Sequence, residues 1–533
     1  MSTAGTDGNS GAGASGAGGS GVPGGEGVPG SEGVPGSEGV PGDESSPPVE
    51  SRVARRRRVQ RPVPGRTTAV VSAVVVLVAV GLVSLAVPAP APAPPAPPGD
   101  GVAVAPTTAL TSSFFCATGA GLDAGAGATG TVVLTNTSMS TARGVMTAVE
   151  SSGSASVRRD VSVPPLGTSD VIPAQGLGAG VTASTFSFAG GGVTGTMVVG
   201  NSSGWSTAPC ASTVASEWDF VGGSTATGLL DLSLYNPTAA QTMVDVSFLT
   251  PSGDVLIPQA YQGLTLLPGQ VLVEGLGAYV QNQTVVATVV QSTSGSLVAT
   301  ELDQLAVKSG SGLALVSGSP GPATTWRFAQ TTAVQGGSVD FSVANTGQST
   351  VTAQVTVGLS SASVTPKQLT VPGHTVVSLV ASAVAGWPLG SPYSVTVAAS
   401  SPVVVGRSVV APPAAASPQG GLIGGTTATA TSWLVVGPGS PGNPLVAGGT
   451  IRSLAIADPG PSPVEVTVTP LAGGRPVAKV MVSPSGLVVL GPSVVGGLRP
   501  LVVTASGPVG VEVDEGPSGA PGVVSASGFP FGD

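Results

Sequence analysis

The chain repeats itself four times with a period of roughly 105 residues, and this period sets the size of its folding unit. A landmark aromatic residue opens each repeat, and successive landmarks lie 103, 108 and 107 residues apart. The four landmarks are Phe115, Trp218, Trp326 and Trp433. The period is too long for a single propeller blade of about 40–50 residues. It is the size of a small domain.

A segment of alternating apolar and polar residues follows each landmark and ends in Asn or Asp. The four terminal residues are Asn136, Asn236, Asn345 and Asp458. The short side chains of Asn and Asp bond the backbone two residues further on. We therefore predict an Asx turn at each of these positions.

Alternation with a period of two is typical of a sheet with one face in a core and the other in water. In MVDVSFL of the second repeat, apolar residues alternate with Asp245 and Ser247. Each repeat then closes with a pair of predicted strands, as in YSVTVAASSPVVVGRSVV of the third. Frequent Gly and Pro mark turns and disfavour helices.

About seven or eight short strands per repeat, with turn signals every 8–12 residues or so, predict an all-β fold. We expect tandem immunoglobulin-like β-sandwich modules, and a β-propeller formed from finer repeats is the main alternative. The predicted modules span residues 111–208, 209–320, 321–420 and 421–533.

An apolar segment near the N-terminus predicts a membrane anchor. Thr67–Val87 contains no charged residue, and at ~1.5 Å rise per residue it spans the ~30 Å hydrocarbon core of a bilayer. The basic juxtamembrane segment 52–66 carries seven arginines, among them Arg55, Arg56, Arg57 and Arg58. Such charges hold their side of the membrane in the cytoplasm, so we expect the C-terminal bulk outside. A cleaved signal peptide is the alternative, but 66 residues before the apolar core is long for one.

Two low-complexity segments flank the anchor. Residues 1–51 are acidic and contain four GVPGxE hexapeptides, which have no apolar face to bury and predict a disordered cytoplasmic tail. Residues 88–110 begin with alternating Pro and Ala, which favours a semi-rigid stalk.

The charge and cysteine content restrict the class of protein. The net charge is −9, and the part after the anchor lacks the basic face that nucleic-acid binding requires. The only two cysteines, Cys116 and Cys210, both follow the anchor, where an oxidising environment favours a disulfide. Two separately buried thiols are the alternative.

The second repeat carries a recognisable pattern of motifs. Trp218 precedes Gly-Gly-Ser-Thr, a strand then ends in Leu-Tyr-Asn-Pro, and a Val-x-Val strand leads to Ser-Gly. This pattern resembles an actinobacterial family of single-pass envelope proteins whose extracellular part is a domain of unknown function. The match is best over residues 210–277 and extends over most of 110–530. The resemblance implies an anchored, extracytoplasmic protein and supplies no catalytic residues.

The sequence offers little conventional active-site chemistry. The single histidine, His374, lies in a Pro-Gly turn, and one histidine with two distant cysteines matches no zinc spacing. The G-x-S-x-G motif at residues 200–204 lacks the following helix and nearby histidine that a nucleophile elbow needs. Glycine-rich matches such as the one beginning at Gly437 open no helix, and we expect no cofactor or metal.

Paired acids are the remaining catalytic candidates. Glu301 and Asp303 lie two apart on a predicted strand, so their side chains share a face at roughly 7 Å, a separation that glycoside chemistry can use. The same spacing recurs in two further pairs, which are Glu217 with Asp219 and Glu512 with Asp514. Solvated polar faces of strands, or weak Ca²⁺ contacts, are the simpler interpretation.

We therefore expect a non-catalytic, membrane-anchored extracytoplasmic protein that is a structural or binding element of the cell envelope. Its partners would be the lipid bilayer and, outside it, wall glycans or other envelope proteins. An envelope-glycan-active hydrolase or accessory factor that uses Glu301 and Asp303 is one alternative. A transmembrane scaffold or sensor with a recruiting acidic tail is the other.

Overall fold

A computed structural model describes most of the chain after residue 100. The described residues are 101–117, 129–151, 155–178, 180–201, 204–226, 228–307, 310–360, 364–410, 420–437, 449–495, 497, 500–517 and 524–531. The predicted tail, the arginines Arg55 to Arg58, the helix at 67–87 and the first part of the stalk lie outside them. Within the described ranges, no helix has the length and apolarity needed to cross a bilayer.

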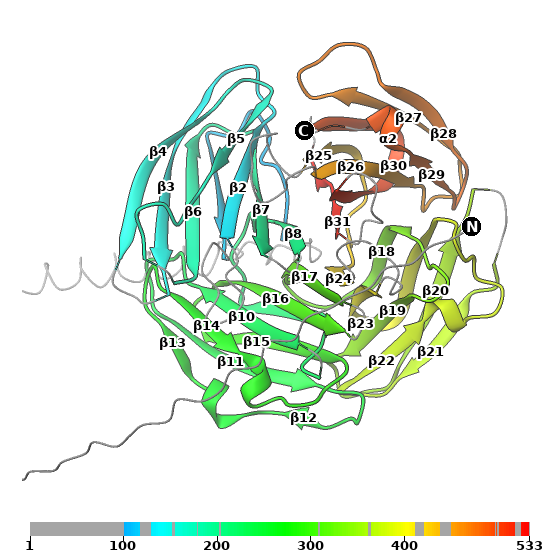
Figure 1. Ribbon diagram of the computed structural model, residues 1–533, viewed down its shortest axis with the longest axis horizontal. Coiled ribbons are helices and arrows are strands. Elements are labelled where there is room, and N and C mark those ends of the chain that lie inside the picture. Colours follow the sequence, from blue (N-terminus) through cyan, green and yellow to red (C-terminus); the bar gives the residue numbers. More distant parts are fainter. Residues whose placement is uncertain are drawn as a thin grey trace, which may run out of the picture. The chain divides into compact units, whose positions relative to one another are not determined.

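The prediction of an all-β fold is confirmed. The strands fall into four consecutive modules, which Figure 1 shows arranged around a common centre like the blades of a four-bladed propeller. From the sequence we expect a propeller only as the alternative fold, and one built from finer repeats. The blades are instead the repeats of roughly 105 residues themselves.

Module 1 consists of two antiparallel sheets, with strand orders β1-β6-β3-β4 and β5-β2-β7-β8. Its core lies between them and contains buried side chains from both, such as Phe186 and Met197. The strands are β1 (Thr111–Cys116), β2 (Thr129–Asn136), β3 (Ala142–Glu150), β4 (Ser156–Val163), β5 (Gly167–Val171), β6 (Thr182–Ala189), β7 (Val193–Asn201) and β8 (Gly204–Pro209).

Module 2 repeats this plan, with sheets ordered β12-β11-β15-β9, where β13 also pairs with β11, and β14-β10-β16-β17. Its elements are β9 (Glu217–Gly223), β10 (Gly228–Tyr235), β11 (Thr242–Leu249), β12 (Val255–Leu256), η2 (Gln259–Tyr261), β13 (Leu264–Leu266), β14 (Val271–Gly275), η3 (Leu276–Ala278), β15 (Val286–Ser294), β16 (Val298–Val307) and β17 (Gly310–Ser317).

In modules 3 and 4 one long strand belongs to both sheets. The elements of module 3 are β18 (Ala323–Thr331), β19 (Ser338–Asn345), β20 (Val351–Gly358), β21 (Lys367–Val371), β22 (Thr375–Val380), η4 (Ala381–Ala383), β23 (Tyr393–Val410) and β24 (Gly420–Gly424). Those of module 4 are β25 (Ala430–Val435), β26 (Gly449–Ala457), β27 (Val464–Pro470), β28 (Ala478–Val482), β29 (Leu487–Leu490), α2 (Pro492–Val495), β30 (Leu501–Pro517), β31 (Val524–Ser527) and β32 (Phe529–Pro530).

The long strand explains why the predicted immunoglobulin-like order is not seen. The first half of β23 pairs with β18 and β20, and its second half pairs with β19 and β24. The two predicted closing strands therefore do not pair with each other, because they are successive parts of one strand that crosses between the sheets. In an immunoglobulin domain the last two strands share a sheet.

A buried tryptophan lies where the chain crosses between the two sheets in modules 2, 3 and 4, and in module 2 the crossing falls between the separate strands β15 and β16. The indole N–H of Trp326 donates to the carbonyl of Val403 at 2.7 Å, where the pairing of β23 changes from β18 and β20 to β19. Trp218 and Trp433 make the equivalent bonds to Leu297 at 2.8 Å and Val509 at 3.0 Å. All three side chains are at most 1% exposed.

In module 1 the equivalent aromatic is Phe114, so the prediction of Phe115 as the landmark was one residue off. Phe114 lies opposite Phe186 on β6, packs in the module core and is 3% exposed, whereas Phe115 is half-buried. Neighbouring residues of a strand lie on opposite faces. Because residues 114 and 115 are both Phe, the sequence does not indicate which of the two faces the core.

The predicted Asx turns are confirmed at all four positions. Asn345 accepts from Gly347 N–H at 3.0 Å, two residues further on, and its amide donates to the carbonyls of Ser349, Val371 and Pro372. Asn136 and Asn236 bond the backbone in the same way. Asp458 accepts from Gly460 N–H at 2.7 Å, but it has no amide to donate, and its buried Oδ2 accepts no hydrogen bond from a described residue.

The predicted disulfide between Cys116 and Cys210 is present. It joins the end of β1 to the residue after β8, so it links the first and last strands of module 1. Both residues are 1% exposed. The two backbone bonds between Phe115 and Ala211, both 2.8 Å, lie beside it.

Residues at the two ends of the described region close the ring between modules 4 and 1. Val104 N–H donates to the carbonyl of Pro530 at 3.3 Å, and Gly101 accepts from Ser212 N–H at 2.8 Å. Val104 and Phe529 join one apolar cluster with Trp205 of module 1 and Leu434 of module 4. Residues 101–110, which are part of the predicted stalk, thus pack against the modules.

The single Asp among the four Asx positions gives a matched pair of substitutions. We expect Asp458→Asn to stabilise the protein by about 1 kcal/mol, because the new amide can donate to backbone carbonyls as its three counterparts do. The reverse change, Asn345→Asp, should cost about 1–3 kcal/mol, because it removes three donated bonds. Thermal and denaturant unfolding measure both, and a stabilising Asn345→Asp would contradict this interpretation.

The same site predicts a pH dependence. Burial raises the pKa of Asp458 above its usual value, partly offset by the Gly460 N–H. Because the folded-state pKa is the higher one, the proton contributes stability at low pH that is lost as pH rises through that pKa. The advantage of Asp458→Asn in unfolding experiments should therefore be smaller near pH 4 than near pH 7. A stability advantage of Asp458→Asn that is the same at both pH values would contradict the raised pKa of Asp458.

Candidate functional site

The acid pair Glu301 and Asp303 lies inside module 2. Both side chains project from β16 and are 1% exposed, and Glu301 accepts a hydrogen bond from Thr288 of β15 at 2.9 Å. Neither residue lines the two cavities described below. A polysaccharide cannot reach these carboxyl groups in this structure.

Burial also changes the protonation of this pair. It raises the pKa of Glu301 to about 7, although the Thr288 hydroxyl partly opposes the shift. Burial, and then the nearby charge of Glu301, raises the pKa of Asp303 well above its usual range. The interpretation of these acids as solvated polar residues was therefore wrong, because the face that they share points into the module and not into water.

The other two acid pairs are also largely enclosed. Asp219 on β9 is 2% exposed, and its partner Glu217 is half-buried. Glu512 on β30 is 2% exposed and belongs to an ion pair. Burial raises the pKa of Asp514 to about 7, although the positive charge of Arg452 acts to lower it.

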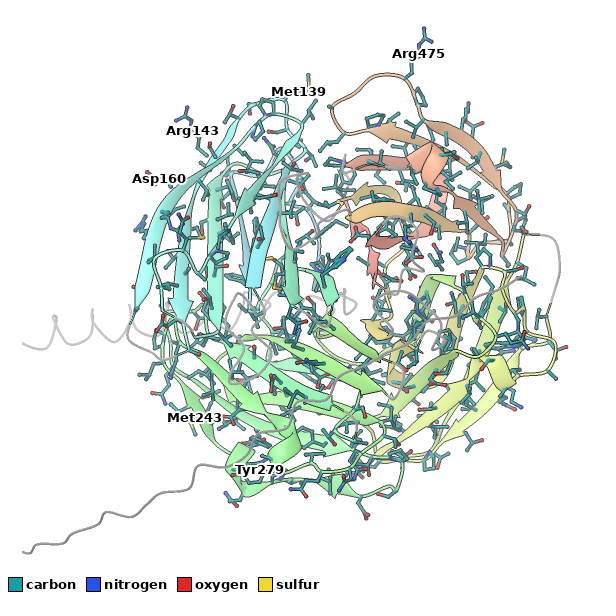
Figure 2. The ribbon with its side chains drawn as sticks, viewed as in Figure 1. Met139, Arg143, Asp160, Met243, Tyr279 and Arg475 are labelled. Carbon is teal, nitrogen blue, oxygen red and sulfur yellow. A yellow bond between two sulfur atoms is a disulfide. The ribbon has the colours of Figure 1, made fainter. Side chains whose placement is uncertain are left out.

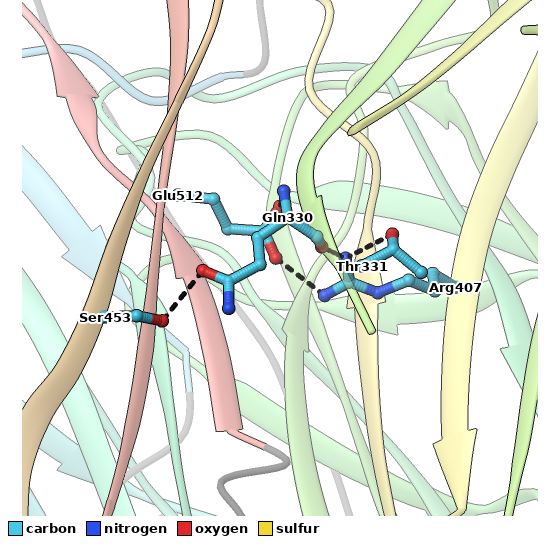
Figure 3. A network of polar contacts seen from close by, with 5 residues as sticks. All are labelled: Gln330, Thr331, Arg407, Ser453 and Glu512. Atoms are coloured by element: carbon cyan, nitrogen blue, oxygen red, sulfur yellow. Dashed lines mark hydrogen bonds and ion pairs between the residues drawn. The ribbon is translucent and has the colours of Figure 1, made fainter. Parts of the chain in front are cut away.

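Glu512 and Arg407 form a buried ion pair across the seam between modules 4 and 3. Arg407 Nη2 lies 2.7 Å from Glu512 Oε1, and the two side chains are 2% and 3% exposed. Figure 3 shows the network around them. Arg407 also donates to the carbonyl of Gln330 and to Thr331 Oγ1, and Glu512 Oε2 accepts from Gln330 N–H at 3.0 Å. Ser453 completes the network by donating to Gln330 Oε1 at 2.9 Å.

The network spans four strands of two modules, with Ser453 on β26, and fixes how the modules pack. Arg407 comes from the second half of β23, Gln330 and Thr331 from β18, and Glu512 from β30. The Arg407 guanidinium also lies 5.4 Å from the centre of the Phe328 ring. A cavity of about 40 Å³ beside the network is lined by Arg407, Asp514 and others.

Sequence reasoning missed Arg407 and its role. Its signal is a single charged residue within the apolar run PVVVGRSVV, where a buried charge requires a partner. The sequence does not indicate that this partner lies in the next module. Glu515 was missed for the same reason.

Glu515 lies in the seam that closes the ring between modules 4 and 1. It is 1% exposed, and Thr207 Oγ1 of β8 lies 3.4 Å from its Oε2. Burial raises the pKa of Glu515 to about 8. A neutral carboxyl at this position avoids the cost of an unpaired buried charge.

The innermost strands of the modules enclose a central cavity of about 90 Å³. Figure 1 shows β8, β17, β24 and β31 converging at the centre. The lining includes Thr207, Asp219, Phe220, Leu315, Ser317, Ser319, Trp326, Val404, Gly424, Thr426, Ser525 and Ser527. Backbone bonds of 2.8 and 2.9 Å between Asp219 and Ser319 tie β9 to the segment after β17.

Among the described residues that line this cavity, Asp219 alone is acidic. Both carboxylate oxygens are buried, and this carboxyl group interacts with the Glu217 side chain through a hydrogen bond. Burial, and then the charge of Glu217, raises the pKa of Asp219 well above its usual range. The cavity with Asp219 is the candidate binding site of the described region.

The remaining sequence motifs form no catalytic arrangement. His374 has a φ of 56° in the turn between β21 and β22, as the Pro-Gly context predicted. The G-x-S-x-G segment connects the antiparallel strands β7 and β8, so no helix follows it. Among the described residues, no three His, Cys, Asp or Glu side chains are grouped so that they could hold a metal ion.

The two ion pairs of the described region provide a controlled stability experiment. Arg407→Met leaves Glu512 charged and buried, and we expect a cost of about 3–5 kcal/mol. Adding Glu512→Gln should recover part of that cost, because the uncompensated charge is removed while the acceptor for Gln330 N–H is kept. Lys479→Met, which breaks the exposed pair with Glu465 (2.8 Å; 63% and 50% exposed), should cost at most about 1 kcal/mol.

Denaturant unfolding of the four proteins measures these differences. Equal costs for Arg407→Met and Lys479→Met would show that the buried pair does not hold the seam. A double variant less stable than Arg407→Met alone would contradict the account of the uncompensated charge.

Comparisons with known proteins give a family and no function. No curated protein matches the chain. A structure titled "Crystal Structure of Thermotoga maritima 1070" is 20% identical, covers 17% of this chain and 81% of its own, and has a TM-score of 0.16. A structure titled "Crystal structure of tetra-tandem repeat in extending region of large adhesion protein" is 14% identical, covers 73% and 91%, and has a TM-score of 0.10. Neither score supports an argument. The family model matches residues 178–485, more than half of the sequence, and the chain therefore belongs to the family of unknown function DUF5719.

Proposed function

We propose that this protein is a non-catalytic, membrane-anchored element of the cell envelope that binds or spaces other envelope components. The observation that carries the proposal is the enclosure of Glu301 and Asp303, each 1% exposed inside module 2. A glycosidase needs its acid and its base or nucleophile on either side of an accessible glycosidic bond. Glu301 and Asp303 are the residues that the hydrolase alternative would use, and a glycosidic bond has no access to them.

The way the modules are joined supports a rigid binding platform. Hydrogen bonds and an ion pair that are buried between modules, such as Arg407 with Glu512, require a defined packing of neighbouring blades. Loops at the ends of the strands are then held at fixed positions, as in other scaffolds that bind through loops.

The outer rim presents varied side chains to a partner. Figure 2 shows Met139, Arg143, Asp160, Met243, Tyr279 and Arg475 projecting at the periphery. Met139 is 83% exposed and Tyr279 58% exposed. Mixed apolar and charged groups of this kind suit contacts with envelope glycans or proteins.

An extracytoplasmic location is supported by the disulfide between Cys116 and Cys210, because such bonds persist in oxidising compartments. In this proposal residues 67–87 form the single membrane anchor with the N-terminus in the cytoplasm. An impermeant protease added to intact cells should then digest the modules and spare the N-terminal tail. Protection of the modules in intact cells would contradict this orientation.

A binding assay with isolated envelope polysaccharide tests the absence of catalysis. We expect saturable binding without release of reducing ends, and the same binding for Glu301→Gln, whose amide oxygen can still accept from Thr288. Turnover by the unmodified protein that Glu301→Gln abolishes would overturn the proposal in favour of a hydrolase. The absence of binding to polysaccharide and to envelope proteins alike would overturn it as well.

A further inference from the structure

The seam between modules 4 and 1 differs from the other three in how the chain crosses it. Short linkers, at residues 210–216, 318–322 and 425–429, lead from each module to the next. Modules 4 and 1 instead contain the last and the first described strands, and they meet only through space. The disulfide between Cys116 and Cys210 lies within module 1 and does not join them. Among the described residues, non-covalent contacts alone close the ring.

The contacts across this seam are mainly apolar. Val104, Trp205, Leu434 and Phe529 belong to one buried cluster to which both modules contribute. A backbone hydrogen bond of 3.3 Å accompanies the cluster, from Val104 N–H to the carbonyl of Pro530. Burial of apolar surface favours closure, and this contribution involves no group that titrates.

Glu515 supplies a polar contact of the seam. It is 1% exposed, and Thr207 Oγ1 of β8 lies 3.4 Å from its Oε2. The seam between modules 3 and 4 also contains a buried carboxylate, but there Arg407 pairs with Glu512. Neither ion pair of the described residues includes Glu515. A buried carboxylate without a cation is costly, so Glu515 is neutral in the closed ring.

The strands around Glu515 offer no compensating charge. Neither β8 nor β31 contains a titratable residue, and residues 101–110 contain none. On β26, Arg452 exerts its charge on Asp514, and the negative charge of Asp514 opposes the ionisation of Glu515. Burial raises the pKa of Glu515 from 4.5 to about 8, with Thr207 acting to lower it and Asp514 to raise it.

We propose that the seam between modules 4 and 1 is a pH-sensitive closure of the ring, which holds while Glu515 carries a proton and opens when Glu515 ionises. In the open state the carboxylate meets water, and Trp205 and Phe529 lose part of their cover. The other three seams stay joined by their linkers, so the ring opens at this seam. The inference concerns the ring alone and is independent of the envelope function.

The direction of the pH dependence follows from proton binding. The closed ring, with a Glu515 pKa of about 8, binds the proton more tightly than the open ring, where the ordinary value of 4.5 applies. Closure is therefore fully favoured below the lower value and weakens as the pH rises to the higher one. Over this interval the ratio of open to closed molecules should increase about tenfold per pH unit.

Hydrogen exchange of the Trp205 indole N–H, followed by NMR on the full-length protein from about pH 5 to about pH 8, measures the opening. Trp205 is 7% exposed and lies in the seam, whereas Trp218 and Trp326 lie inside their modules. Protection factors correct for the intrinsic pH dependence of exchange. We expect the protection of Trp205 to fall about tenfold per pH unit, and that of Trp218 and Trp326 to stay higher throughout.

Two variants test the role of Glu515, and a third serves as control. Glu515→Gln cannot ionise, and its amide oxygen can still accept from Thr207, so the protection of Trp205 should no longer depend on pH. Thr207→Ala removes the hydroxyl that lowers the pKa of Glu515, so the fall in protection should continue to a higher pH than in the unmodified protein. Glu301→Gln removes a buried acid of module 2 with a pKa of about 7, and its profile should match that of the unmodified protein.

Three results would overturn the inference. One is a protection of Trp205 that does not change with pH in the unmodified protein, and another is the same fall in Glu515→Gln. The third is equal exchange of Trp205, Trp218 and Trp326, because the ring would then unfold as a whole instead of opening at the seam. If Glu515→Gln does not fold, Thr207→Ala decides the question, and an unshifted profile in that variant would contradict the proposed role of Glu515.

Discussion

The hydrogen bond between a buried indole and the carbonyl at which the chain passes from one sheet of a module to the other underlies the rest of the structure. It occurs at Trp218, Trp326 and Trp433, at distances of 2.7 to 3.0 Å. At each crossing the chain leaves the sheet that contains the tryptophan and enters the other sheet of the module, as β23 and β30 do. The backbone at such a bend has lost ladder partners, and a fixed indole donor satisfies one of its carbonyls away from water.

The central cavity follows from this crossing. The second half of each long strand, or its separate counterpart in modules 1 and 2, pairs with a strand near the end of the module, which is β8, β17, β24 or β31. These four strands meet at the centre of the ring (Figure 1). Their approach is close enough that an added Cβ at Gly312 would collide with Gly420. The cavity with Asp219 is the space that they leave.

Local features of the sequence predicted local features of the structure. Alternation of apolar residues gave the strands, and Asn136, Asn236, Asn345 and Asp458 make the predicted backbone bonds because those bonds involve only nearby residues. The disulfide was predictable because a chain with two cysteines has only one way to pair them. The order of strands was not predictable. The sequence Ser-Ser-Pro at residues 400–402 is equally compatible with a hairpin turn and with a single strand that passes from one sheet to the other.

The candidate site was predicted less well than the fold, because the sequence does not show which acidic residues are buried inside a module and which line the cavity. The pair Asp219 and Glu217 and the pair Glu301 and Asp303 have the same spacing, yet Asp219 lines the central cavity while Glu301 and Asp303 are closed inside a module. Period-two alternation says which residues share a face of a strand, but only the packing of a neighbouring sheet or module decides what that face meets. Arg407 shows the same limit, since its partner Glu512 is 105 residues away in the chain.

Hydrogen exchange of the five tryptophan indole N–H groups, followed by NMR, tests the role of the crossings most directly. Trp387 is a useful internal control, because it is 6% exposed but its Nε1 has no acceptor among the described residues. The account predicts that the indoles of Trp218, Trp326 and Trp433 exchange only when their modules unfold, far more slowly than that of Trp387. Exchange of those three at the rate of Trp387 would contradict it.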